Sequence, residues 1–109
     1  MNISIANDFS HIPSGRYIED GDFSAQQFRD NILIPALQEE KEIFLNLDGT
    51  IGFSSCFLEE VFGGLIRSGF TSHILKEKLH IQTELTIYLE RVWRYIYDEE
   101  KRSLINPIK

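Results

Sequence analysis

The sequence has few of the residues that build covalent or metal-linked frameworks: one cysteine, three histidines and three prolines among 109 residues. A single cysteine excludes a disulfide within the chain. It also excludes zinc sites made of four cysteines, or of two cysteines and two histidines. No apolar run approaches the roughly 18 to 20 residues that a membrane-spanning helix needs. The N-terminus lacks the basic stretch and apolar segment of a signal peptide. We therefore predict a cytoplasmic chain that does not enter a membrane.

Basic residues are also scarce, because 11 lysines and arginines face 17 aspartates and glutamates, giving a net charge of −6. The deficit lies in residues 1–60, which carry a net charge of −8, whereas residues 61–109 carry +2. Nucleic-acid-binding surfaces are basic, so the acidic front half argues against a nucleic-acid partner and favours a protein with a basic face. The chain is 42% hydrophobic, which is enough apolar material for a core, and its 109 residues fit one folded domain. We place this domain at residues 1–109.

Short apolar runs predict the strands of a small sheet. Residues 42–47 form the most continuous run and are expected to be the central buried strand. Apolar and polar residues alternate at residues 2–6 and 79–83, which predicts two more strands, and residues 16–18 are a candidate for a fourth. Helical patterns separate these segments. The sequence therefore predicts an α/β domain, with a small mixed, mostly parallel sheet of three to five strands packed with helices.

Capping residues mark the first long helix. Ser24 and Gln27 have the spacing of a capping box and begin a predicted helix that reaches Glu40. Pro35 lies inside this helix and should kink or divide it, because proline cannot donate the helical hydrogen bond. The apolar side chains that recur every four residues here are Phe28, Ile32 and Ala36.

A second helix is expected to begin at Ser54 or Ser55 and to stop at Gly69. Its inward stripe is Phe57, Val61 and Leu65. Residues 71–78 predict a further short helix.

Thr83 is expected to cap a long final helix. The spacing of its apolar residues predicts a buried stripe of Leu85, Leu89, Val92 and Ile96. The solvent-exposed face of the helix would carry Glu90, Arg91, Arg94 and Glu99. Three aromatic residues lie partly off the stripe, namely Trp93, Tyr95 and Tyr97. They indicate a second contact, either a dimer surface or a partner, unless neighbouring loops cover the rings.

Two segments carry a resemblance to a known family. Residues 15–24 read Gly-Arg-Tyr-Ile-Glu-Asp-Gly-Asp-Phe-Ser and are followed by Phe28-Arg29 and Pro35-Ala36-Leu37. Residues 45–65 are more specific: a strand and a short turn lead to paired serines and to a helix with Phe-Leu-Glu-Glu-Val-Phe-Gly-Gly. Together these segments resemble the bacterial STAS-like family of unassigned function, over about residues 15–82. The resemblance implies a STAS-like fold and a relation to anti-sigma factor antagonists.

In anti-sigma factor antagonists, a partner kinase phosphorylates a serine at the start of the helix after the central strand. Their motif, Asp-Ser-Ser-Gly, falls on residues 53–56 of this chain and places the phosphorylated position at Ser55, with Ser54 as the neighbouring candidate. Phe53 and Cys56 replace the aspartate and the glycine of that motif. The resemblance implies a non-enzymatic regulatory domain with a protein partner, either a histidine-kinase-like ATPase or an anti-sigma-type kinase.

The physical chemistry of a helix start permits such a switch. Unpaired amides and the positive end of the helix dipole favour an anion, and a phosphate would add about −1.5 to −2 charge at Ser55. Glu59 and Glu60 oppose it, because they already place negative charge about one turn away. Serine is a preferred cap in any helix, so the alternative is that Ser54 and Ser55 only cap the helix.

We expect the partner to contact the start and the exposed face of this second helix. Gly63 and Gly64 cost about 1 kcal/mol each in a helix relative to alanine. They indicate close packing against a neighbouring element, or a flat patch where a partner approaches the backbone. Arg16 and Arg29 are expected to pair with local carboxylates. The predicted partner-binding residues are Arg16, Cys56, Glu59, Glu60, Gly63 and Gly64.

Two other functions stay open from the sequence. Cys56 lies in the first helical turn, a position that favours a reactive thiolate, so a small enzyme or redox protein could use it with nearby turn carboxylates. Those carboxylates are Asp20, Asp22 and Asp48. The chain could instead be a structural homo-oligomer, such as a homodimer formed through the final helix.

The three histidines, His11, His73 and His80, are too widely spaced for a metal site. We predict no metal, no cofactor and no catalytic residue.

Overall fold

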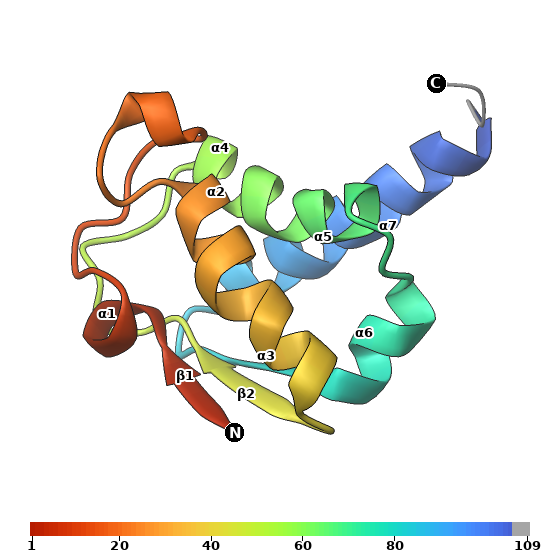
Figure 1. Ribbon diagram of the computed structural model, residues 1–109, viewed down its shortest axis with the longest axis horizontal. Helices are drawn as coiled ribbons and strands as arrows, with labels where there is room; N and C mark the ends of the chain where they lie inside the picture. The colour runs from red at the N-terminus through yellow and green to blue at the C-terminus, as the bar shows by residue number, and fades with distance from the viewer. Residues whose placement is uncertain (106–109) are drawn as a thin grey trace.

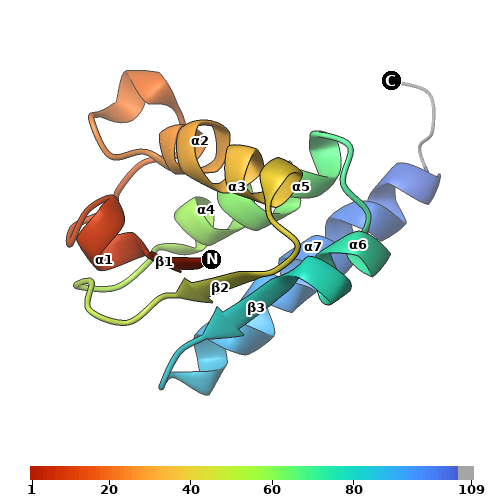
Figure 2. The same cartoon turned by 60° about the horizontal axis from the view of Figure 1, so that its bottom comes forward.

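The computed structural model describes residues 1–105, and its centre is a three-stranded parallel sheet. The strands are β1 (Asn2–Ser4), β2 (Ile43–Asn46) and β3 (Leu79–Gln82). Their order is β1-β2-β3, so the predicted central strand is central (Figure 2). Helices connect the parallel strands, as the parallel arrangement requires. The predicted small α/β fold is confirmed.

Helices form a layer over one face of this sheet (Figure 1). Two of them are continuous runs with a π-helical turn in the middle. Helix 25–39 comprises α2, η2 and α3, and helix 55–67 comprises α4, η3 and α5. The bounds are α1 (Ile5–Asp8), the 3-10 helix η1 (Ile18–Asp20), α2 (Ala25–Phe28), η2 (Arg29–Leu33), α3 (Ile34–Glu39), α4 (Ser55–Leu58), η3 (Glu59–Gly63), α5 (Gly64–Arg67), α6 (Ser72–Lys78) and α7 (Thr86–Ile105).

Side chains of the sheet alternate between the helical layer and the opposite face. Ile43, Leu45 and Leu79 are buried in the core between the sheet and the helices. The alternate positions are mostly polar: Asn2, Ser4, Asn46, His80 and Gln82. Phe44 is half-buried among them, with its ring stacked on His80 at a centroid distance of 4.8 Å. The helices therefore cover one face of the sheet, and the polar face lies opposite.

The predicted strand at residues 16–18 is wrong. The chain instead folds back through η1, because the Asp20 carboxylate accepts hydrogen bonds from the backbone N–H groups of Arg16 and Tyr17 at 3.0 and 2.9 Å. The first strand is also shorter than residues 2–6. Ser4 ends it by capping α1, and its hydroxyl accepts from the N–H of Asn7 at 3.1 Å.

Helix 25–39 begins and ends as predicted, but its buried face differs. The capping box of Ser24 and Gln27 is present, and the helix ends at Glu39. The π-helical turn η2 precedes Pro35, and it adds a residue to the spacing of the buried positions. The side chain buried one turn after Phe28 is therefore Leu33, whereas Ile32 is only half-buried.

The structure contains the predicted helix stop at Gly69 and the predicted short helix at residues 71–78. Gly69 follows helix 55–67 with φ +110°, and the N–H of Phe70 donates back to the carbonyl of Leu65 at 3.0 Å. This is the glycine stop that was predicted. Thr71 caps α6, as its hydroxyl accepts from the N–H of Ile74 at 3.2 Å.

The final helix α7 departs from its predicted pattern in its first turns and at Glu99. It begins at Thr86, three residues after Thr83, whose hydroxyl accepts from the N–H of Leu85 at 3.1 Å and donates to Asp48 at 3.0 Å in the preceding turn. Leu85 and Leu89 are 53% and 37% exposed, so only the second half of the predicted stripe, Val92 and Ile96, is buried.

Tyr88 takes the inward position at the start of α7 in place of Leu85 and Leu89. Its ring packs edge-on against Phe53 at 5.3 Å, and its hydroxyl accepts from the Phe53 N–H at 3.2 Å. Glu99, predicted on the wet side, is 7% exposed because Arg67 and Arg102 cover it.

None of the helices described in residues 1–105 combines the length and the apolar composition that crossing a membrane requires.

Candidate functional site

Two adjacent serines at the start of helix 55–67 have different roles. Ser54 is the N-cap: its backbone is extended, and its hydroxyl accepts from the N–H of Phe57 at 3.0 Å. Ser55 is the first helical residue and is exposed. Within residues 1–105, its hydroxyl has no hydrogen-bond partner. The side chain of Ser55 is therefore available to solvent, whereas that of Ser54 is occupied by the helix.

We expect Ser54→Ala to lower the free energy of unfolding by about 1 kcal/mol, the usual cost of losing a helix N-cap. Ser55→Ala is expected to change it by less than about 0.5 kcal/mol, because alanine is well tolerated in a first helical turn. Urea unfolding of the two variants measures the difference. Equal losses would show that Ser54 is not the cap.

A network of four arginines and four carboxylates surrounds η3; we call it the arginine–glutamate network. Its members are Arg16, Arg29, Arg67, Arg102, Asp30, Glu59, Glu60 and Glu99. It connects the loop before helix 25–39, helix 25–39 itself, helix 55–67 and α7.

Arg16 reaches this network from the loop before helix 25–39. Its Nη1 donates to Glu59 at 2.5 Å and to Glu60 at 3.1 Å. The hydrogen bond to Glu59 raises the pKa of Arg16 above its ordinary value. Its carboxylate partners lie 43 and 44 residues away along the chain, so Arg16 joins the loop to the start of the second helix.

Arg29 and Glu60 form the buried centre of the network. Arg29 is 9% exposed and Glu60 is 6% exposed. Nη1 of Arg29 donates to the carboxylate of Glu60 at 2.6 Å and to its backbone carbonyl at 2.9 Å, while Nε donates to the adjacent Asp30 at 2.8 Å. Burial lowers the pKa of Arg29, but the hydrogen bonds to Asp30 and Glu60 outweigh burial and leave that pKa raised.

Arg67 extends the network to α7. It donates to Glu59 at 2.8 Å and to Glu99 at 3.0 Å, and Arg102 donates to Glu99 at 2.7 Å. Burial raises the pKa of the Glu59 carboxyl, but hydrogen bonds from Arg67 and Arg16 outweigh burial and hold that pKa below its usual value. Glu59 is therefore held as a carboxylate between two arginines.

The paired glycines make room for these charged side chains. A Cβ on Gly64 would lie 2.2 Å from Nη1 of Arg29, and one on Gly63 would lie 2.6 Å from Oε2 of Glu59. Both glycines are buried. Close packing against Arg29 and Glu59 therefore explains why glycines stand inside this helix, as the first of the two interpretations from the sequence predicts.

A comparison with models of known protein families matches residues 24–84 to the STAS-like domain of unknown function (DUF4325). The chain belongs to this family. The match begins at the Ser24 cap and ends just after β3, so it contains β2, both candidate serines and all of helix 55–67. No curated protein and no solved structure matches the chain.

The six predicted partner-binding residues of this STAS-like domain divide into two groups. Arg16, Cys56 and Glu59 are exposed or half-buried around the helix start. Glu60, Gly63 and Gly64 are buried. A partner could touch the first group, whereas the second group supports the network from beneath.

An open hollow of about 570 Å³ lies over the network. Its lining is Arg16, Tyr17, Glu59, Glu60, Arg67 and Arg102. Three arginines and two glutamates line it, and both glutamates are paired with arginines, which makes the hollow a charged contact surface with one more cation than anions.

The other polar candidates of the STAS-like domain do not converge. Asp20 holds the η1 turn, and Asp48 accepts from Thr83, so these two carboxylates serve separate turns. His80 contacts Glu42 at 2.9 Å, and His73 lies 3.8 Å from Glu77. In the described part of the chain, no three metal-ligating side chains come together.

Sequence reasoning missed Arg67, Glu99 and Arg102 as members of the network. Helical spacing in the sequence indicates some of these pairs. Arg67 follows Glu60 by seven residues, which places both on one helix face, and Arg102 follows Glu99 by three. The contact between Arg67 and Glu99 has no such signal, because it depends on how α7 packs on helix 55–67.

Proposed function

We propose that this STAS-like domain is a non-enzymatic regulatory domain of the bacterial cytoplasm that binds a protein partner through the start of helix 55–67. In the sharper form of the proposal, a histidine-kinase-like ATPase or anti-sigma-type kinase phosphorylates Ser55 and thereby changes the affinity. The division of roles between the serines carries the proposal. The Ser54 hydroxyl is occupied as the N-cap, and the Ser55 hydroxyl is exposed.

The charge around Ser55 also supports a phosphate there. Glu59 and Glu60 lie within about a turn and would repel it if they were unpaired. Glu59 is instead paired with Arg16 and Arg67, and Glu60 with Arg29. The arginines therefore offset the repulsion, and the helix amides and dipole favour the added charge.

Apolar surface beside the serines offers area for a partner. An open hollow of about 450 Å³ lies next to Ser54 and is lined in part by Pro13, Ile51, Phe53 and Tyr88. Ile51 is 81% exposed and stands beside the apolar rings of Phe53 and Tyr88, and contiguous apolar surface of this kind marks protein contacts. A partner that covers Ile51 would also cover Ser54, which lines the same hollow and precedes Ser55 in the chain.

The experiment incubates the purified chain with ATP and each histidine-kinase-like ATPase of the same organism in turn, followed by mass spectrometry. We expect one phosphate on Ser55, its loss in Ser55→Ala and its retention in Ser103→Ala, a matched change at an exposed serine of α7. Ser55→Glu should alter the partner Kd by about tenfold, equivalent to about 1.4 kcal/mol. An unmodified Ser55, together with unchanged binding by Ser55→Glu, would contradict the proposal.

A second candidate is a redox or nucleophilic role for Cys56, favoured by its exposure in the first turn of helix 55–67. Such a role also needs a general base, and the nearby Arg16 cannot serve as one because a guanidinium cannot accept a proton. A Cys56→Ser variant that keeps partner binding and phosphorylation would count against this role.

A further inference from the structure

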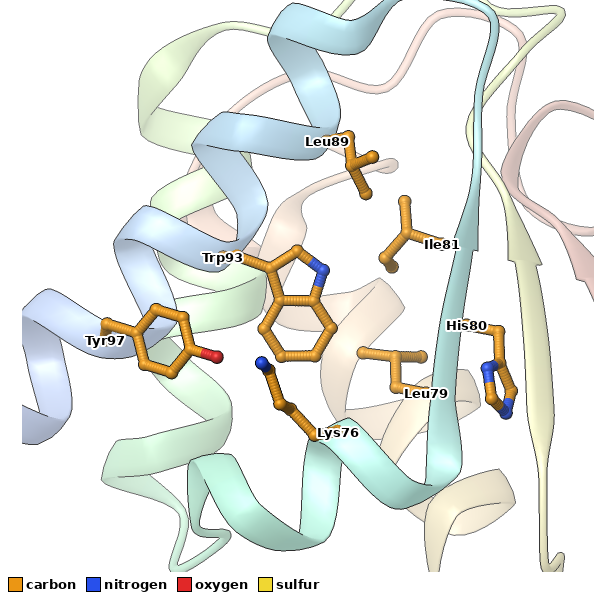
Figure 3. Close-up of a pocket in the computed structure, with 7 residues that line it drawn as sticks. All are labelled: Lys76, Leu79, His80, Ile81, Leu89, Trp93 and Tyr97. Atoms are coloured by element: carbon orange, nitrogen blue, oxygen red, sulfur yellow. The ribbon is translucent and has the colours of Figure 1, made fainter.

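We propose that the free edge of β3 and the adjoining face of α7 form a docking groove for an extended, carboxylate-bearing segment of a partner protein. The groove has a volume of about 460 Å³ and is lined mainly by Lys76, Leu79, Ile81, Leu89, Trp93 and Tyr97 (Figure 3). None of these residues belongs to the start of helix 55–67. The proposal is therefore independent of Ser55 and goes beyond the regulatory role.

The backbone of β3 presents hydrogen-bonding groups to this groove. The carbonyl of Gln82 accepts from the N–H of Leu47 at 2.9 Å, so it points toward the β2 side. Backbone groups of successive strand residues point to opposite sides, so the N–H and carbonyl of Ile81 point away from β2. Within residues 1–105 neither group has a partner outside the sheet. Ile81 can therefore donate to and accept from an added strand.

The opposite edge of the sheet is closed at the equivalent place. The carbonyl of Met1 accepts from the N–H of Phe44 at 2.8 Å, so the backbone groups of Met1 and Ile3 point toward β2. Successive residues alternate, so the N–H and carbonyl of Ser4 point away from β2. The N–H of Ser4 donates to the Asp8 carboxylate at 2.8 Å, and the chain then turns into α1. The Asp8 side chain thus occupies the outward N–H of Ser4 at the β1 edge, whereas the outward N–H of Ile81 at the β3 edge faces an open groove.

A strand on one side and a helix on the other are the usual walls of a groove that binds an extended peptide. The Trp93 ring points from α7 toward β3, and Lys76 reaches from α6 toward Tyr97 (Figure 3). Leu89 and Tyr97 are 37% and 39% exposed. An added strand would place alternate side chains between β3 and α7, where they would cover these apolar surfaces.

The charge of the groove selects the chemistry of the segment. No acidic residue lines it, and its cation is Lys76, whose Nζ lies 5.7 Å from the centre of the Tyr97 ring. Lys76 forms no ion pair within residues 1–105. It stands near the N-terminal end of β3, so an antiparallel segment would bring a carboxylate at its C-terminal end to this cation.

The test measures binding of fluorescein-labelled peptides Thr-X-Thr-X-Thr-Glu, with Val, Ile, Leu or Phe at each X, to the full chain. This pattern places both X residues and the glutamate on one side of a strand. We expect saturable fluorescence anisotropy with a Kd below about 1 mM for members of the set. NMR shifts are expected at the amides of Ile81, Leu89 and Trp93 and not at Ser55.

Charge reversal provides the decisive variant. Lys76→Glu should weaken binding by about fivefold or more, and peptides ending in Lys in place of Glu should then bind better than they bind the unaltered chain. Lys101→Glu, on the exposed side of α7, is the matched control and should leave binding unchanged.

Three outcomes would overturn the proposal. No peptide of the set binds below about 1 mM; Lys76→Glu has no greater effect than Lys101→Glu; or the free chain self-associates with the Ile81 amide already protected from exchange. The last result would assign the groove to a second copy of the chain.

Discussion

Gly64→Ala is expected to lower the free energy of unfolding by about 3 kcal/mol, although alanine favours a helix over glycine by about 1 kcal/mol. A Cβ at this position would lie 2.2 Å from Nη1 and 3.0 Å from Cδ of Arg29. Arg29 cannot move aside easily, because it is 9% exposed and is held by Glu60 and Asp30. Displacing it would leave the buried Glu60 carboxylate without its nearest donor.

Gly63→Ala is the matched control for this change. Its Cβ would lie 2.6 Å from Oε2 of Glu59, which is the end of a flexible and half-buried side chain that can shift. We expect this variant to remain within about 1 kcal/mol of the unaltered chain, because the helix-propensity gain offsets the shift. Urea unfolding of both variants gives the comparison. If Gly64→Ala were as stable as Gly63→Ala, Gly64 would not be required for seating Arg29.

Features set by short stretches of sequence were predictable. The central strand follows from one apolar run, and the start of helix 25–39 follows from the capping box of Ser24 and Gln27. The start of helix 55–67 at Ser54 and its stop at Gly69 follow from capping chemistry in the same way. In each case, the residues that decide the structure are neighbours in the chain.

Features set by contacts between elements were not predictable. The π-helical turn before Pro35 moves the buried position from Ile32 to Leu33, and a regular helical period cannot anticipate that added residue. Glu99 has the polarity of a surface residue and is buried because Arg67 and Arg102 approach it from two helices. The sequence therefore predicts the paired serines at the helix start. It does not predict the arginine–glutamate network, which forms only when the helices pack together.

Arg29→Met is the second change with a large expected effect, a loss of about 3 kcal/mol in the free energy of unfolding. Methionine keeps much of the apolar stem of arginine and packs adaptably, so the loss reports on the charge. The variant removes the donor that lies 2.6 Å from the Glu60 carboxylate and 2.9 Å from its carbonyl. Glu60, which is 6% exposed, would then keep only its longer contacts, to Arg16 at 3.1 Å and to Arg67 at 3.4 Å.

The double variant Arg29→Met with Glu60→Met should be more stable than Arg29→Met alone, because it also removes the buried carboxylate. Removing Glu60 leaves no other arginine without a partner, since Arg16 keeps Glu59, and Arg67 keeps Glu59 and Glu99. The two single variants and the double variant form a double-mutant cycle, measured by urea unfolding. Losses that simply add would mean that Arg29 and Glu60 contribute independently. A coupling of about 2 kcal/mol would instead show that the arginine is retained chiefly to neutralise this one buried carboxylate beneath the candidate phosphorylation site.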